Sequence, residues 1–212
     1  MKLYTFHRSS AAYRVRIALN LKELAHDFEF ISLPRGEQRS EAYLATNPQG
    51  LVPTLVTGER DLLTQSLAII EYLDEMHPEP ALLPSNAHDR ALVRAMAQVI
   101  ACDIHPLNNL RILGYLKDPL GHDQGTVNKW YRHWITRGFE SLEAMVARYG
   151  TQCFCFGDRP GLADICLVPQ VYNARRFETD LEPYPNLAKI DENLRNLRSF
   201  ANAAPEAQPD AM

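Results

Sequence analysis

The chain has 212 residues, of which 46% are hydrophobic and 23% are charged, and its formal net charge is −4. Its 10 glycines and 14 prolines are close to ordinary usage, which excludes collagen-like and low-complexity proteins. Neither residues 1–80 nor the remainder is basic, so the charge pattern of a nucleic-acid-binding protein is missing and no nucleic-acid partner is expected. The length predicts one large or two small folded domains.

The amino-terminal residues 1–8 lack the long apolar segment of a secretory signal, and no stretch approaches the roughly 20 apolar residues that span a bilayer. We therefore expect a soluble cytoplasmic protein without a membrane partner, whose four cysteines are reduced thiols. Cys153 and Cys155 have no second pair at zinc-finger spacing, so no metal site is expected.

Residues 1–80 alternate between strand-like and helix-like patterns. Helical spacing of apolar residues predicts helices at 12–22, 39–45 and 66–76, the last capped by Ser66. Short apolar runs predict strands at 2–6, 28–33, 54–56 and 62–64, the last two joined by a turn at Gly58-Glu59-Arg60. The order βαβ followed by ββα predicts a compact mixed sheet.

A proline-rich connection follows, and strand-like alternation is then scarce. We predict domains at 1–80 and 88–212 with a linker at 81–87, the second domain being all-helical. Its predicted helices are 88–117, 127–149, 162–177 and 186–203, with a polar tail at 204–212. Pro106 should kink or break the first of these helices just before that residue.

The segment Arg8–Leu19 places two serines between the end of a strand and the start of a helix. Unpaired N–H groups at a helix start favour a negative charge, so Ser9 and Ser10 mark a candidate anion site. A serine hydroxyl there can also donate to a thiolate or a carboxylate. The alternative is a plain N-cap, and Arg14 and Arg16 fit a structural role equally well.

Two further segments can likewise be interpreted either as ligand-binding or as purely structural. Val52-Pro53 precedes a predicted strand after a turn, where a cis bond can expose a backbone edge to an extended peptide. An ordinary trans bond is the alternative. Gln65-Ser66 begins a predicted helix and is either a second anion site or an N-cap.

Taken in this order, the motifs resemble the glutathione S-transferase superfamily, and specifically its zeta class, the maleylacetoacetate isomerases. The resemblance covers essentially the whole chain and implies an α/β thioredoxin-like N-terminal domain followed by an all-α domain. The zeta motif Ser-Ser-Cys-x-Trp-Arg-Val-Arg-Ile-Ala-Leu is matched by residues 9–19. Further matches lie at 47–53, 65–66, 102–110, 156–164, 168–177 and 208–210.

Three positions depart from the family pattern. Ala11 replaces the motif's cysteine, so any role of that thiol is absent, and Tyr13 replaces its tryptophan, a change of similar volume. Gly161 stands where a serine or threonine caps a helix three residues before Asp164, and we expect a weaker cap there.

The resemblance implies glutathione as cofactor, whose thiolate adds reversibly to a conjugated double bond, and a dicarboxylate enone as substrate. Ser9 would donate to the sulfur, with Ser10 and Arg14 beside it as further catalytic residues. The implied cofactor-binding residues also include Gln38, Val52, Pro53, Gln65, Ser66, His105 and Asn109. The implied substrate-binding residues are Arg8, Arg111 and Arg176.

The function expected from the resemblance is conversion of maleylacetoacetate to fumarylacetoacetate in aromatic amino-acid breakdown, by a homodimer. Maleylpyruvate isomerase is a close alternative, because its substrate differs by one carbonyl-bearing unit. A general glutathione-conjugating transferase or haloacid dehalogenase shares the thiolate chemistry. A non-enzymatic glutathione-binding module is the remaining alternative.

Overall fold

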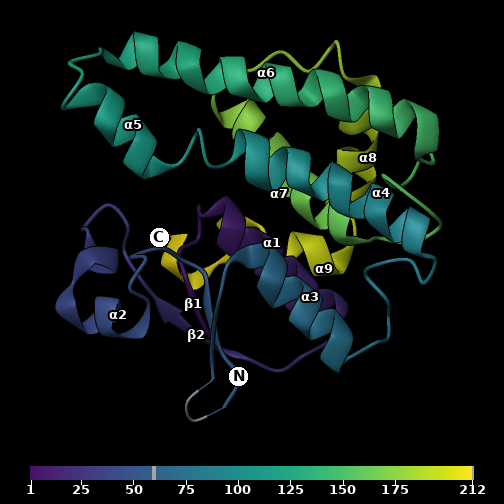
Figure 1. Ribbon diagram of the computed structural model, residues 1–212, viewed down its shortest axis with the longest axis horizontal. Coiled ribbons are helices and arrows are strands. Elements are labelled where there is room, and N and C mark those ends of the chain that lie inside the picture. Colours follow the sequence, from purple (N-terminus) through teal and green to yellow (C-terminus); the bar gives the residue numbers. More distant parts are fainter. Residues whose placement is uncertain (59–60, 212) are drawn as a thin grey trace. The chain divides into compact units, whose positions relative to one another are not determined.

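The computed structural model describes residues 1–58 and 61–211, which form two compact units (Figure 1). The N-terminal unit comprises Met1–Ala81 together with the described residues from Asn196 onward, and the helical unit comprises Leu82–Arg195. The segment after Arg195 therefore packs with the sheet-containing unit, whereas the sequence analysis assigned it to the all-helical domain.

The N-terminal unit contains a four-stranded sheet in the order β2-β1-β3-β4. β1 pairs in parallel with β2 and antiparallel with β3, and β3 pairs antiparallel with β4. β1 and β4 consequently run in the same direction, so the residues that follow them emerge at the same edge of the sheet. The strands are β1 (Lys2–Thr5), β2 (Asp27–Phe30), β3 (Thr54–Val56) and β4 (Leu62–Thr64).

The predicted βαβ-ββα mixed sheet is thus confirmed. Of the predicted hairpin turn at Gly58-Glu59-Arg60, Glu59 and Arg60 lie outside the described residues. The helical elements of the sequence up to Ala81 are α1 (Ser10–Leu21), η1 (Glu37–Arg39), α2 (Glu41–Thr46) and α3 (Ser66–Met76).

Alternation along β1 assigns these helices to the two faces of the sheet. Thr5 Oγ1 accepts a hydrogen bond from Arg16 of α1 at 3.0 Å, and α1 packs against α3. On the other face, Tyr4 and Phe6 pack with Tyr43 of α2. Figure 1 accordingly shows α1 and α3 together and α2 apart from them.

The last part of the chain packs against α1. The predicted helix at 186–203 ends instead at Arg195, and Leu197 has extended backbone before a new turn of helix. Asn20 Nδ2 of α1 then donates to Ser199 O at 2.9 Å. This bond and the packing of α9 against α1 connect the segment to the N-terminal unit. Its elements are α9 (Arg198–Ala201), η3 (Pro205–Ala207) and η4 (Pro209–Ala211).

In the helical unit, α7 is buried along almost its whole length and packs against α4 and α8. The predicted helix 88–117 is interrupted ahead of Pro106, as expected, by a π-helical stretch and a turn. No helix in the described part of the chain is long and apolar enough to cross a membrane. The elements are α4 (Ala87–Gln98), η2 (Val99–Ile104, the π-helix), α5 (Leu110–Lys117), α6 (Gln124–Tyr149), α7 (Leu162–Arg176) and α8 (Pro185–Arg195).

The start of α7 shows why glycine replaces the expected capping hydroxyl. Asp164 Oδ2 accepts from Gly161 N–H at 2.9 Å, and no side chain caps the helix at position 161. Instead, Leu162 N–H donates to Leu82 O at 2.9 Å, and a Cβ on residue 161 would lie 3.0 Å from that oxygen. The backbone carbonyl of Leu82 therefore takes the place of the expected capping hydroxyl as a hydrogen-bond acceptor. Burial raises the pKa of Asp164 to about 6.

A second glycine allows the π-helix to approach α6 closely. A Cβ added to Gly138 would lie 2.3 Å from both Cγ1 and Cδ1 of Ile104, a fully buried side chain. Gly114, on α5, has no atom within 4 Å of its added Cβ. The two helical glycines thus differ in steric surroundings.

Gly138→Ala is expected to lower the free energy of unfolding by about 1–2 kcal/mol, because Ile104 must leave its packed rotamer. Gly114→Ala gains helix propensity without a clash, so it is expected to raise that free energy by up to about 1 kcal/mol. Urea unfolding followed by circular dichroism measures both. Equal effects of the two variants would contradict the close-packing argument.

Candidate functional site

The sheet brings most of the predicted N-terminal residues to one edge. α1 begins shortly after β1 and α3 directly after β4, and these two strands end at the same edge. Val52 and Pro53 precede β3, which begins at that edge because it runs the opposite way. We call this group the sheet-edge site, and it consists of Ser9, Ser10, Val52, Pro53, Gln65 and Ser66.

Ser9 is the N-cap of α1. Its Oγ accepts from Ala12 N–H at 3.2 Å, and its side chain is half-buried. A hydroxyl that accepts a backbone N–H still has its own proton to donate. The capping role is therefore compatible with donation to a ligand, and Ser10 is the buried first residue of the helix.

Arg14 links the starts of the two helices. Its side chain is buried, and Nη1 donates to Ser66 Oγ at 3.3 Å. The prediction that Ser66 caps α3 is wrong: it is the first helical residue, and Gln65 occupies the cap position without a side-chain capping bond. The hydroxyl of Ser66 instead accepts from Arg14, which places a buried cation beside both helix starts.

The Val52-Pro53 bond in the loop before β3 is cis, as the family motif implies. The preceding carbonyl, Leu51 O, accepts from Tyr43 Oη at 2.6 Å and from Asn47 Nδ2 at 2.8 Å. The backbone N–H and C=O of Val52 make no hydrogen bond to another residue that the structure describes. The backbone N–H and C=O of Val52 can therefore pair with an extended peptide ligand.

Gln65 has φ 68° and ψ 115°, a conformation that L-residues rarely adopt. Its Nε2 donates to Gln49 Oε1 at 3.1 Å, a partner that the sequence analysis missed because no local pattern marks it. Gln38 contacts the same loop, since its backbone oxygen lies 3.0 Å from an added Cβ on Gly50. Gln38 Oε1 is buried and has no hydrogen-bond partner among the described residues.

These features fit a small, extended anionic ligand. Neither α1 nor α3 has an acidic residue in its first turn, so the positive ends of both helices are uncompensated there. The backbone edge at Val52 and the orphaned Gln38 oxygen add unpaired polar atoms in the same unit. Arg8, also predicted, is exposed with its guanidinium carbon 5.8 Å from the Phe6 ring centroid.

In the helical unit, Arg176 is an exposed cation. Its guanidinium carbon lies 5.0 Å from the centroid of Phe177, whose ring stacks on Tyr131 at 3.6 Å. Within the described ranges it forms no ion pair. Arg132, which sequence reasoning missed, donates to Phe177 O at 3.3 Å, and burial raises the pKa of Tyr131 to about 12. Two arginines thus flank one aromatic stack.

The neighbouring Arg175 has a structural role. Its Nη1 lies 2.6 Å from Oδ2 of the fully buried Asp191, which also pairs with Arg195 at 2.9 Å. Burial raises the pKa of Asp191, and the two arginines oppose that rise. Of the adjacent pair 175 and 176, only Arg176 remains available for a ligand.

The remaining predicted residues lie around the turn before α5. Asn109 caps this helix, its Oδ1 accepting from Arg111 N–H at 3.2 Å, and Arg111 is exposed. His105 follows the π-helix and is half-buried. Asn108 Nδ2 donates to Tyr131 O at 3.0 Å, so the turn is anchored to α6 next to the aromatic stack.

Comparison with known proteins identifies the family of this chain. The model of the glutathione S-transferase N-terminal domain matches residues 3–81, and that of the C-terminal domain matches residues 128–189. The chain is 53% identical, over 99% of its length and 97% of the relative's, to a probable maleylacetoacetate isomerase of Vibrio cholerae. The chain therefore belongs to the glutathione S-transferase family, in its zeta class, which confirms the resemblance and the fold.

Two solved structures extend the comparison. The holo structure of a maleylpyruvate isomerase, a bacterial zeta-class glutathione S-transferase, has a TM-score of 0.97 and 48% identity, with full coverage of both chains. A maleylacetoacetate isomerase of Methylobacterium extorquens AM1 with bound malonate and glutathione has a TM-score of 0.96 and 40% identity, again with full coverage.

Gln65→Gly is expected to raise the free energy of unfolding by about 1 kcal/mol, because glycine adopts the observed φ without strain. Glu23→Gly is the matched control, since Glu23 has φ 53° in the same unit but outside the sheet-edge site. It should raise that free energy less, because the left-handed helical region is the milder conformation. Urea denaturation of both variants measures this, and destabilisation by Gln65→Gly would contradict the assigned strain.

Proposed function

We propose that the protein is a glutathione-dependent cis–trans isomerase that converts maleylacetoacetate to fumarylacetoacetate. The observation that carries the proposal is the position of the Ser9 hydroxyl. It caps α1, which has no acidic residue in its first turn, and it still has its own proton to donate. Full-length similarity to two kinds of zeta-class isomerase supports the same reaction. We also propose that it acts as a cytoplasmic homodimer without a membrane or nucleic-acid partner.

The sheet-edge site has the groups that a tripeptide thiol requires. The backbone of Val52, next to Pro53, would pair with the cysteinyl part, and Gln65 with Ser66 would bind the γ-glutamyl carboxylate at the start of α3. Gln38 would supply a further contact to the peptide. His105 and Asn109 of the helical unit are proposed as further glutathione-binding residues. When bound, glutathione supplies the sulfur that turns the conjugated double bond transiently into a rotatable single bond.

The protein's own task is to keep that sulfur ionised. A cysteine thiol has a pKa near 8.5, so it is mostly protonated at neutral pH. The Ser9 hydroxyl can donate to the anion, and the first-turn N–H groups of α1 favour negative charge. Ser10 and the buried Arg14 are proposed to assist from the same helix, whereas Ala11 supplies no thiol of its own.

The substrate carries two carboxylates and an enone, so it requires cations. Arg176 is exposed and free of ion pairs with the described residues, which makes it the best candidate for carboxylate binding. Arg8 and Arg111 are also exposed and are proposed to contribute. A guanidinium near the carbonyl would stabilise the enolate that develops during addition.

The direct test is turnover of maleylacetoacetate, or its analogue maleylacetone, and of maleylpyruvate, each with and without glutathione. Turnover only with glutathione establishes the isomerase, and the ratio of the kcat/KM values identifies the preferred substrate. Maleylpyruvate isomerase is the second candidate, favoured by the structural similarity to that enzyme. Glutathione binding without either turnover would instead support a conjugating transferase, a haloacid dehalogenase or a binding module.

Ser9→Ala is expected to raise the pKa of the bound glutathione thiol by about one to two units, because a hydrogen bond to a charged group is lost. Thiolate absorbance against pH measures the shift. Ser40→Ala is the matched control, since Ser40 Oγ caps α2 through an equal 3.2 Å bond from Tyr43 N–H. An unchanged thiol pKa in Ser9→Ala would reject the assigned role.

Arg176→Ala is expected to raise the KM for the diacid substrate about tenfold or more while leaving the Kd of glutathione nearly unchanged, because a charged hydrogen bond to carboxylate is lost. Steady-state kinetics and calorimetry measure the two constants. Arg148→Ala is the control, because Arg148 is also exposed and lies 5.0 Å from the ring of the next residue, Tyr149. An unchanged diacid KM would remove Arg176 from the substrate site.

A further inference from the structure

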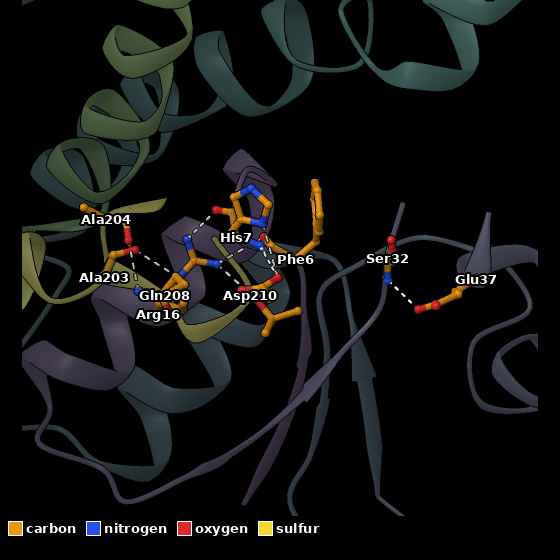
Figure 2. Close-up of polar contacts among 10 residues, drawn as sticks. Phe6, His7, Arg16, Ser32, Glu37, Ala203, Ala204, Gln208 and Asp210 are labelled. Atoms are coloured by element: carbon orange, nitrogen blue, oxygen red, sulfur yellow. Dashed lines mark hydrogen bonds and ion pairs between the residues drawn. The ribbon is translucent and has the colours of Figure 1, made fainter. Parts of the chain in front are cut away.

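The loop that leads to Ser9 is held by a buried arginine. The Arg16 side chain on α1 is buried, and its Nη2 donates to His7 O at 2.9 Å and its Nη1 to Phe6 O at 3.3 Å. The same guanidinium donates through Nε to Ala203 O at 3.0 Å (Figure 2). One side chain therefore joins the loop after β1 to the C-terminal segment.

Burial lowers the pKa of Arg16 to about 10, so the group stays protonated at neutral pH. Its four hydrogen-bond acceptors among the described residues are neutral oxygens, the fourth being Thr5 Oγ1. The charge is thus stabilised by these oxygen dipoles, which must keep their positions, and by the nearby carboxylate of Asp210, which raises the pKa of Arg16. Displacement of the C-terminal segment would leave a buried cation short of an acceptor.

The C-terminal segment also reaches the loop directly, through Asp210. Its Oδ2 accepts from His7 N–H at 2.9 Å and lies 3.3 Å from His7 Nδ1, and its side chain is mostly buried (Figure 2). The segment is itself braced, because Gln208 Nε2 donates to Asn202 O at 2.9 Å and to Ala204 O at 3.0 Å. Asp210 therefore lies on a hydrogen-bonded, folded segment.

Together these bonds hold both polar backbone groups of His7, its N–H by Asp210 and its C=O by Arg16. Ser9 is two residues further on, and its own N–H donates to Phe6 O at 3.0 Å. Phe6 O in turn accepts from Arg16. The orientation of the Ser9 backbone thus depends on the bond between His7 and Asp210, which lie 203 residues apart in the chain.

We propose that Asp210 is a positioning residue for the reaction: by holding His7 N–H it sets the loop that aims the Ser9 hydroxyl at the sulfur. This inference rests on the proposed function, because Ser9 is the group that it positions. The contribution comes from a hydrogen bond to a backbone N–H, so a neutral oxygen at the same place should serve nearly as well. A contribution from negative charge would act oppositely, since a carboxylate near a thiolate raises the thiol pKa.

The test compares Asp210→Ala, which removes the acceptor, with Asp210→Asn, which keeps an oxygen and loses the charge. Asp210→Ala is expected to raise the pKa of the bound glutathione thiol by about half a unit or more and to lower kcat/KM about tenfold. Asp210→Asn should stay within about twofold of the wild type. Asp158→Asn, at an 89% exposed side chain in the helical unit, is the matched control.

A second measurement, made without glutathione, is amide hydrogen exchange. Exchange at His7 and Ser9 should accelerate in Asp210→Ala but not in Asp210→Asn, while amides in the strands keep their protection. An unchanged thiol pKa or unchanged exchange in Asp210→Ala would overturn the proposal. So would equal impairment in both variants, or a lowered thiol pKa in Asp210→Asn, because charge would then be the contribution.

The wild-type protein separates this inference from the proposed function. Failure of the wild type to ionise bound glutathione would reject the role of Ser9 and, with it, the positioning of that role by Asp210. A normal wild type with an unaffected Asp210→Ala rejects the positioning alone.

Discussion

The constraint on which the site depends is the meeting of two helix starts at one edge of a four-stranded sheet. Because β1 and β4 run in the same direction, α1 and α3 begin at the same edge with their first-turn N–H groups unpaired within the helices. Neither helix has an acidic residue in its first turn. A negatively charged ligand is therefore favoured there by backbone groups alone.

Two buried arginines on α1 maintain this geometry in different ways. Arg14 donates to Ser66 and so couples the two helix starts, whereas Arg16 holds the loop after β1 and the C-terminal segment. A buried guanidinium is costly unless it has hydrogen-bond acceptors, so each neighbour that supplies an acceptor is constrained. Burial of these two charges costs desolvation free energy, which is consistent with a site whose loops must be held in position before a ligand binds.

Much of the fold could be predicted because it is encoded in local patterns. The strand at 54–56 and the helix at 66–76 match their predicted bounds, since period-2 and period-3.6 apolar spacing reflect faces that must be buried. The cis bond before Pro53 was recognised through the family motif. The cap of α3 was predicted wrongly, because a serine at a helix start is ordinarily its cap, and only the contact with Arg14 shows that Ser66 lies one residue further in.

By itself the sequence predicted the fold class and the family, because these follow from contiguous motifs such as residues 9–19, and it named the residues of the sheet-edge site as candidates. The tertiary structure alone decided that Arg175 pairs with Asp191 while Arg176 stays exposed, and that residues after Arg195 pack against α1. It also decided the contact of Asp210 with His7. These contacts join residues far apart in the chain, and no local period or spacing records which distant group supplies the acceptor.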